Sequence, residues 1–158
     1  RRALHANAIG AGIALAMSAA MGLLLPVNPE APELAARTAV GLTDVVLALA
    51  SGTAGALAFT AGVPATLVGV MVAVALLPPA TAAGVYLGAG EWTRSADAFS
   101  LLAVNVVCVN LSATATFLLQ GVRPDTWWEA DRARSATHRA LLAWAAMLSA
   151  LVLLLVLT

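Results

Sequence analysis

The sequence predicts an all-α, polytopic helical membrane protein with about five transmembrane helices, one of them broken at a Pro-Pro pair. Hydrophobic residues make up 61% of the 158 positions and charged residues only 10%, which leaves too few polar side chains to cover a soluble domain. The mean hydropathy is +0.93. Apolar stretches of about 20 residues, the length that crosses a bilayer, recur along the chain. We therefore expect residues 1–158 to form a single transmembrane helical domain.

The apolar stretches define the expected membrane spans in order. They lie at about 4–25, 40–60, 64–89, 97–120 and 140–157. Prolines and glutamates between the first two spans predict a turn-rich loop, and the short interval from Thr60 to Val63 predicts a tight helical hairpin. The chain begins with Arg1 and Arg2 instead of methionine, so we expect it to be part of a longer protein.

The third span contains Pro78 and Pro79 near its centre. Proline has no amide hydrogen and disfavours helical dihedrals in the preceding residue, so we expect a broken helix at this point. Irregular backbone at membrane depth is tolerated only where it is buried in protein or lines a water-filled cavity. The carbonyls of Val74 and Ala75 and the hydroxyl of Thr81 are then candidates for coordinating a cation or a polar solute. The alternative is that neighbouring helices satisfy these groups and the prolines only kink the span.

Three further polar residues lie within the expected spans. Asp44 is near the start of the second span, and ionisable groups at membrane depth suggest function by default. It is either a pathway residue or the partner of Arg37 in a structural ion pair at the helix start. Asn105 and Asn110 lie on different faces of the fourth span, where an asparagine either faces a cavity or bonds a neighbouring helix.

Small residues recur at intervals of four in three spans and predict close helix packing, in a compact bundle or a homo-oligomer. The three series are Gly10, Ala14, Ser18 and Gly22, then Ala48, Gly52 and Ala56, then Ala80, Gly84 and Gly88.

Arginines in short loops are retained on the cytoplasmic side, and their distribution predicts a cytoplasmic N-terminus and an external C-terminus. On this topology the cytoplasmic arginines are Arg1, Arg2, Arg123, Arg132, Arg134 and Arg139, and the external ones are Arg37 and Arg94. The segment 122–139, with Trp127 and Trp128, is expected to lie at the cytoplasmic interface. We expect a multi-pass protein of a prokaryotic inner (plasma) membrane.

The sequence contains no enzyme signature. No phosphate-binding loop, dinucleotide fingerprint or metalloprotease motif is present, and His5 and His138 lack metal-ligand spacing. We therefore expect no enzymatic activity, no metal and no cofactor. A formal net charge of zero argues against nucleic-acid binding. Cys108, the one cysteine, is expected to be a buried core residue.

Three segments resemble a family of uncharacterised hydrophobic membrane proteins, domain of unknown function 389, over about residues 1 to 125. The segments are ARTAVGLTDVVLALASGTAGALA, LVGVMVAVALLPPATAAGV and NVVCVNLSATATFLLQGVRP. Within them the resemblance rests on Arg37, Thr38, Asp44, residues 48–55, residues 73–79, Asn110 and residues 121–124. Members usually carry threonine where this chain has Val109. The resemblance implies a further N-terminal membrane segment, so this chain would be the C-terminal membrane portion of a protein with two related broken spans, as in repeat-built transporters.

These observations favour a transporter-like or channel-like protein of unknown substrate, with a cation or small polar solute as the candidate. The alternative is a non-conducting oligomeric membrane scaffold or a sensory domain for a soluble partner. The expected partners are the lipid bilayer, further copies of the chain, and a small ion or polar solute.

Overall fold

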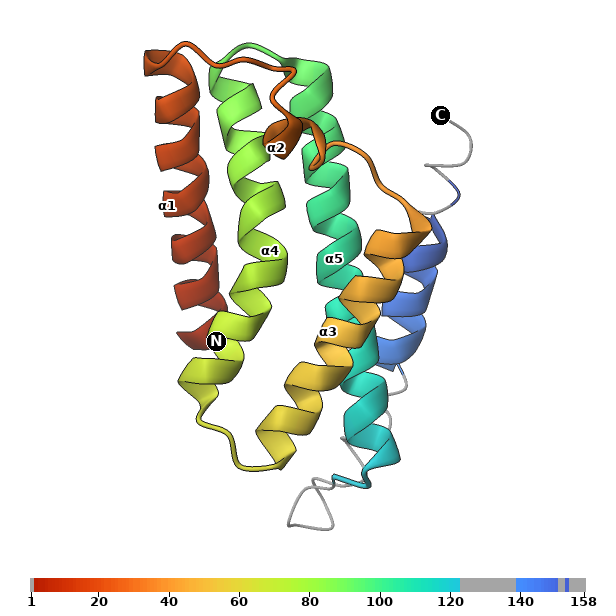
Figure 1. The fold of residues 1–158 in the computed structure, drawn as a ribbon. Coiled ribbons are helices and arrows are strands. Elements are labelled where there is room, and N and C mark those ends of the chain that lie inside the picture. Colours follow the sequence, from red (N-terminus) through yellow and green to blue (C-terminus); the bar gives the residue numbers. More distant parts are fainter. Residues whose placement is uncertain (1, 123–138, 151–152, 154–158) are drawn as a thin grey trace. The chain divides into compact units, whose positions relative to one another are not determined.

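The computed structural model describes residues 2–122, 139–150 and 153, and these residues are helical or in short connections. The helices are α1 (Arg2–Leu24), α2 (Pro32–Ala35), α3 (Leu42–Thr60), α4 (Ala65–Gly88) and α5 (Trp92–Leu119) (Figure 1). Residues 139–150 form a further helical segment. No strand occurs among the described residues, so the all-α prediction is confirmed.

Within the described residues, α3, α4 and α5 are long and apolar enough to cross a membrane. Shorter apolar helices are found at Ile9–Leu24 and Arg139–Ala150, where the first and fifth spans were expected, so the count of five stays a prediction. Large apolar side chains are exposed along the helices, for example Leu42 at 84% and Leu119 at 89%. Exposure on this scale is expected of helices that face lipid.

The predicted break at Pro78 and Pro79 is wrong, because α4 runs as one α-helix from Ala65 to Gly88 through both prolines. A proline removes its own donor and strains the preceding turn, but its fixed φ is compatible with a helix, so packing can keep the helix intact. Pro79 is fully buried here. Only two donors are missing from the helix, those that would bond to the carbonyls of Val74 and Ala75.

Three helices end at a glycine in the left-handed region: Gly62 after α3 (φ 82°), Gly90 after α4 (φ 80°) and Gly121 after α5 (φ 68°). The amide of each glycine and that of the following residue bond back to carbonyls of the last helical turn, at N–O distances of 2.9–3.2 Å. This Schellman arrangement satisfies terminal carbonyls and requires a residue that tolerates positive φ.

The chain divides into two compact units, each described by itself. The first comprises Arg1–Gly41 and Val74–Ala103, and the second comprises Leu42–Ala73 and Val104–Thr158. Helices α4 and α5 therefore contribute one part to each unit.

In the first unit, α1 packs in parallel against the C-terminal part of α4. A Cβ added at Gly84 would overlap Ser18, and one added at Gly88 would overlap the carbonyl of Ala19. A Cβ at Gly22 would likewise overlap the carbonyl of Val85. The two backbones approach so closely that only glycine fits, which confirms the predicted small-residue packing at these positions.

The rest of the first unit's core lies between α4 and α5. Buried residues Ala82, Ala83, Tyr86 and Ala98 form this core, with Leu34 packed against it. The hydroxyl of Ser95 donates a 2.9 Å hydrogen bond to the carbonyl of Ala83 and so links α5 to α4.

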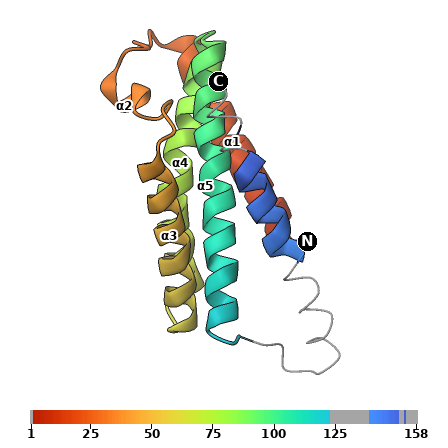
Figure 2. The same cartoon turned by 90° about the vertical axis from the view of Figure 1, so that its right-hand side faces the viewer.

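In the second unit, α3 packs beside the C-terminal part of α5 (Figures 1 and 2). A Cβ at Gly52 would overlap Ser112 and the backbone of Val109. The rings of Phe59 and Phe117 form an edge-to-face pair with centroids 6.0 Å apart. The buried small residues of α3 are Ala48, Gly52, Gly55 and Ala56, which confirms the second predicted series.

Only part of the first predicted series of small residues, the one in α1, lies at a helix contact. Gly10 is exposed, and a Cβ added there would meet nothing within 4 Å. The same residue spacing therefore marks a contact at Ser18 and Gly22 but an open face about two turns before Ser18.

Candidate functional site

The proline pair lies in the first unit, with its two rings in different environments. Pro79 is fully buried and Pro78 is half-buried. Val74, one turn earlier, is 69% exposed. The hydroxyl of Thr81 donates a 2.9 Å hydrogen bond to the carbonyl of Pro78, so its hydrogen is used within α4. Its lone pairs and the backbone oxygens around the prolines are the groups that could contact a cation.

Asp44 lies in the first turn of α3 and is half-buried. A carboxylate at this position is stabilised by the partial positive charge of the helix N-terminus. Arg37 is exposed in the turn after α2, and residues 39–41 separate that turn from α3, so the two residues do not share one helix. Both the ion pair and the pathway role of Asp44 stay predictions.

The polar residues of α5 that the sequence singled out lie in the second unit. Asn110 is exposed, and its amide donates a 2.7 Å hydrogen bond to the carbonyl of Val106. Asn105 is half-buried. Because the proline pair belongs to the first unit, a polar cavity shared by all these residues stays a prediction.

Sequence reasoning missed a cluster in the first unit that fastens residues 25–41, here called the strap, to α4 and α5. The hydroxyl of Tyr86 donates a 3.1 Å hydrogen bond to the carbonyl of Pro29. The guanidinium of Arg94 donates to the same carbonyl and forms an ion pair with Glu30. We call these four residues the clasp.

One signal could have revealed the clasp. The chain has a single tyrosine, and it lies near the end of an apolar span. A tyrosine with a fully buried ring needs a partner for its hydroxyl, and the nearby loop carbonyls supply one.

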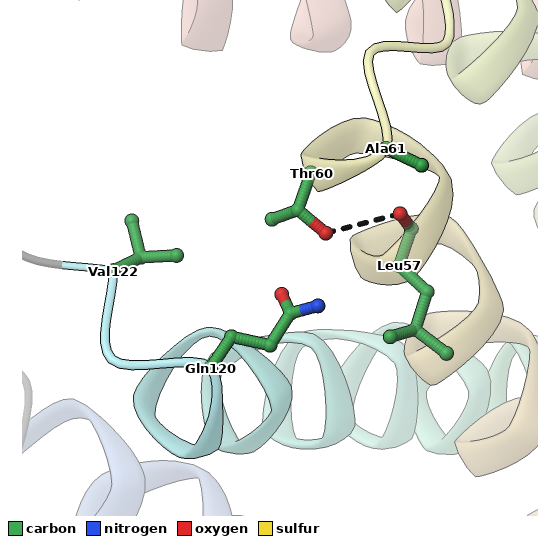
Figure 3. Close-up of a pocket in the computed structure, with 5 residues that line it drawn as sticks. All are labelled: Leu57, Thr60, Ala61, Gln120 and Val122. Atoms are coloured by element: carbon green, nitrogen blue, oxygen red, sulfur yellow. Dashed lines mark hydrogen bonds between the residues drawn. The ribbon is translucent and has the colours of Figure 1, made fainter.

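The second unit contains an open pocket at the C-terminal ends of α3 and α5. Its volume is about 570 Å³, and it is lined by Leu57, Thr60, Ala61, Gln120 and Val122 (Figure 3). The Thr60 hydroxyl donates a 3.0 Å hydrogen bond to the carbonyl of Leu57. These five side chains are uncharged, so the pocket can offer apolar contact and hydrogen bonds but no ionic partner.

Among the described residues, no group of three or more His, Cys, Asp or Glu side chains could hold a metal ion. Cys108 is buried, as predicted. His138, Trp127 and Trp128, together with residues 123–138 of the expected interfacial segment, lie outside the described residues.

Comparison with known proteins identifies the family. The family model described as Domain of unknown function (DUF389) matches residues 1–111. The chain belongs to the DUF389 family. An uncharacterised protein of Methanocaldococcus jannaschii is 34% identical to this DUF389 chain over 140 residues, which are 89% of this chain and 44% of that protein. The chain thus spans less than half the length of this relative. No solved structure matches this chain.

Proposed function

We propose that this DUF389 chain is a transporter-like or channel-like membrane domain that conducts a cation or a small polar solute. The supporting observation is the proline pair in the middle of a continuous apolar helix. Lipid cannot hydrogen-bond to backbone groups, so a carbonyl that loses its helical donor at this depth takes a partner from neighbouring protein groups or from a bound ion or solute. Helices with interrupted backbone hydrogen bonding are a common feature of substrate sites in membrane transporters.

The proposed pathway is lined by oxygen atoms and one carboxylate, the ligands that cations prefer. The proposed lining residues are Asp44, Val74, Ala75, Pro78, Pro79, Thr81, Asn105 and Asn110. The protein would lie in a prokaryotic inner membrane with its N-terminus in the cytoplasm, and it would catalyse no reaction.

Flux into liposomes tests this proposal. The purified protein is reconstituted into vesicles that contain a K⁺ or Na⁺ indicator, and a cation gradient is applied. We expect uptake above that of protein-free vesicles, and we expect its loss in the double variant Pro78→Ala/Pro79→Ala and its reduction in Asp44→Asn. Pro64→Ala is the matched control, because Pro64 precedes the first residue of α4 and takes no donor from the helix interior.

A second function, a non-conducting oligomeric scaffold, is favoured by the packing around Pro79. This residue is fully buried, and α1 lies against the following turns of α4 with no room for a Cβ. A scaffold would give no flux of any cation with the unmodified protein. It would form a stable homo-oligomer in lipid nanodiscs, whose mass is measurable by light scattering.

A further inference from the structure

We infer that the pocket at the C-terminal ends of α3 and α5 binds the headgroup of a phospholipid that carries a primary ammonium group. Its five lining residues, Leu57, Thr60, Ala61, Gln120 and Val122, all belong to the second unit, so the pocket is formed within one compact unit. Its volume of about 570 Å³ is in the usual range of ligand pockets, about 300–1,000 Å³. A headgroup and the first part of its acyl chains can enter a pocket of this size.

The position of the pocket favours lipid as the occupant. Helix α3 has 19 residues, a length of about 28 Å at 1.5 Å per residue, and both α3 and α5 are apolar enough to cross a membrane. The hydrocarbon core of a bilayer is about 30 Å thick, so the end of α3 at Thr60 would lie at the level of the headgroups. Leu57 and Val122 are exposed beside the pocket, where they would contact the acyl chains.

The backbone at the pocket offers hydrogen-bond acceptors. A helix leaves its last carbonyls without a helical donor. The capping amides bond to the carbonyls of residues 57–59 in α3 and 116–118 in α5. No backbone amide of the described residues donates to the carbonyls of Thr60, Ala61 or Gln120, which all belong to lining residues. These oxygens can therefore accept hydrogen bonds from a ligand.

The two polar side chains of the pocket add further acceptors. The hydroxyl of Thr60 donates its hydrogen within α3, where it lies 3.0 Å from the carbonyl oxygen of Leu57 and 3.1 Å from that of Ala56. Only its lone pairs are left for a ligand. The side-chain amide of Gln120 extends toward Thr60 (Figure 3) and supplies one acceptor oxygen and one donor group. Its donor group suits the phosphate of the same headgroup.

Electrostatics favour the ammonium group over an anionic headgroup. The C-terminal end of each helix carries a partial negative charge of about half an elementary charge, and two such ends meet at this pocket. None of the five lining residues is the lysine or arginine that usually binds a phosphate. A primary ammonium brings three donors to the acceptors, whereas a trimethylated ammonium has the same charge and brings none.

Native mass spectrometry of the purified protein in detergent micelles, with one added phospholipid at a time, measures this selectivity. The probes are dioleoyl phosphatidylethanolamine, its N,N-dimethyl derivative and dioleoyl phosphatidylcholine, which share their chains and phosphate but differ in ammonium donors. We expect affinity to fall in this order, by about tenfold from first to last, the ratio expected of one hydrogen bond to a charged group. Equal binding of the three would mean apolar contact only and would overturn the inference. Binding of dioleoyl phosphatidylglycerol as tight as that of phosphatidylethanolamine would also overturn it.

Variants of the lining residues locate the bound lipid. Thr60→Val and Gln120→Leu each remove one acceptor at an exposed helix end, and together they should reduce the preference to about threefold or less. Ala61→Phe fills the pocket and should weaken the binding of phosphatidylethanolamine. Thr114→Val is the matched control, because this hydroxyl also donates within its own helix, 2.7 Å from the carbonyl oxygen of Asn110, but does not line the pocket.

Unchanged selectivity in both the double variant and Ala61→Phe would mean that the lipid binds elsewhere, and the inference would fail. The outcome does not depend on transport, because a protein that conducts no cation can still select its lipid.

Discussion

The close contact between α1 and α4 depends on glycines, which have no side chain to separate the two backbones. At Gly84 and Gly88 a single methyl group would overlap Ser18 and the backbone at Ala19. Close backbone approach of this kind replaces the hydrophobic effect as the source of helix association in lipid, because it increases van der Waals contact. Together with Gly22, whose added Cβ would overlap the carbonyl of Val85, these glycines are therefore expected to be the most sensitive positions of the first unit.

Replacing either glycine by alanine should destabilise the protein. We expect Gly84→Ala and Gly88→Ala to cost about 1–3 kcal/mol, the usual range for overpacking a close contact. Gly69→Ala is the control on the same helix, since a Cβ at Gly69 meets nothing within 4 Å. It should be neutral or stabilising by up to about 1 kcal/mol, because alanine is the better helix former. Unfolding in detergent micelles measures the difference, and equal losses for all three variants would contradict the packing argument.

At the scale of single residues, the spacing of small residues predicted which helix faces pack closely, but it did not predict the residues that they contact. The interval of four identifies one face of a helix, and at Ser18 and Gly22 that face is a contact. Gly10 has the same interval and an open surface. Periodicity is a property of one helix, whereas a contact depends on two, so the partner could not be predicted from the spacing.

The fourth helix shows where local rules fail at the scale of an element. A proline inside a helix costs about 3 kcal/mol, and two in succession predict a break. The helix nevertheless continues, with Pro79 and the following small residues buried in the first unit's core. The sequence locates the weak point correctly, but the outcome depends on tertiary packing, which local dihedral preferences do not include.

The strap is the element whose anchoring depends most on a few polar contacts. Its helix α2 has only four residues and no buried side chain, although Leu34 packs against the core. A helix this short is not stable by itself. The three donor contacts of the clasp are therefore expected to hold the strap in place.

Loss of the clasp should release the strap while the helices remain folded. Tyr86→Phe removes a buried hydroxyl with its hydrogen bond and should lower the free energy of unfolding by about 0.5–1.5 kcal/mol. Arg94→Gln removes the other donors of the clasp and should accelerate hydrogen exchange at residues 29–38. Glu30→Gln should change exchange least, because the Glu30 side chain is 77% exposed and surface ion pairs contribute little. Amides of α3 serve as the internal reference. If Glu30→Gln has the largest effect, the ion pair and not the shared carbonyl of Pro29 anchors the strap.

On the scale of the whole molecule, the first unit bears on topology. Parallel packing means that α1 and the C-terminal part of α4 run in the same direction. The clasp joins the strap, which follows α1, to the end of α4 and the start of α5. The strap and the connection between α4 and α5 therefore lie at one end of this unit. The topology predicted from the arginines requires the same arrangement, with both connections outside the cell.

Cysteine accessibility tests this topology. In a Cys108→Ala background, Glu33→Cys in the strap should react with a membrane-impermeant maleimide in intact bacterial cells. Ala61→Cys, in the turn between α3 and α4, should react only after permeabilisation; both native side chains are exposed. The reverse pattern would mean that the N-terminus is external and that the arginine distribution does not set the orientation.

The residue types of the candidate site could be predicted from the sequence, but their positions in the fold could not. Proline, aspartate and asparagine in apolar segments are conspicuous because each is costly in lipid. Their distribution over two compact units could not be predicted, since unit boundaries follow from packing between segments distant in the chain. Tyr86 and Arg94 were missed for the same reason, because their partner Pro29 lies in a loop.

The parallel contact of α1 with α4 also has a consequence for biosynthesis. Pro29 and Arg94 are 65 residues apart, so at 5–20 residues per second the ribosome needs about 3–13 s to supply the second after the first. As the first membrane span, the predicted role of α1, this helix would lie in the bilayer without its partner during that delay. Its continuous apolar part is one of the shorter ones, Ile9–Leu24. Retention of the first span in the membrane would thus depend on the later synthesis of α4. Insertion of α1 would therefore be the step of biosynthesis that fails most easily.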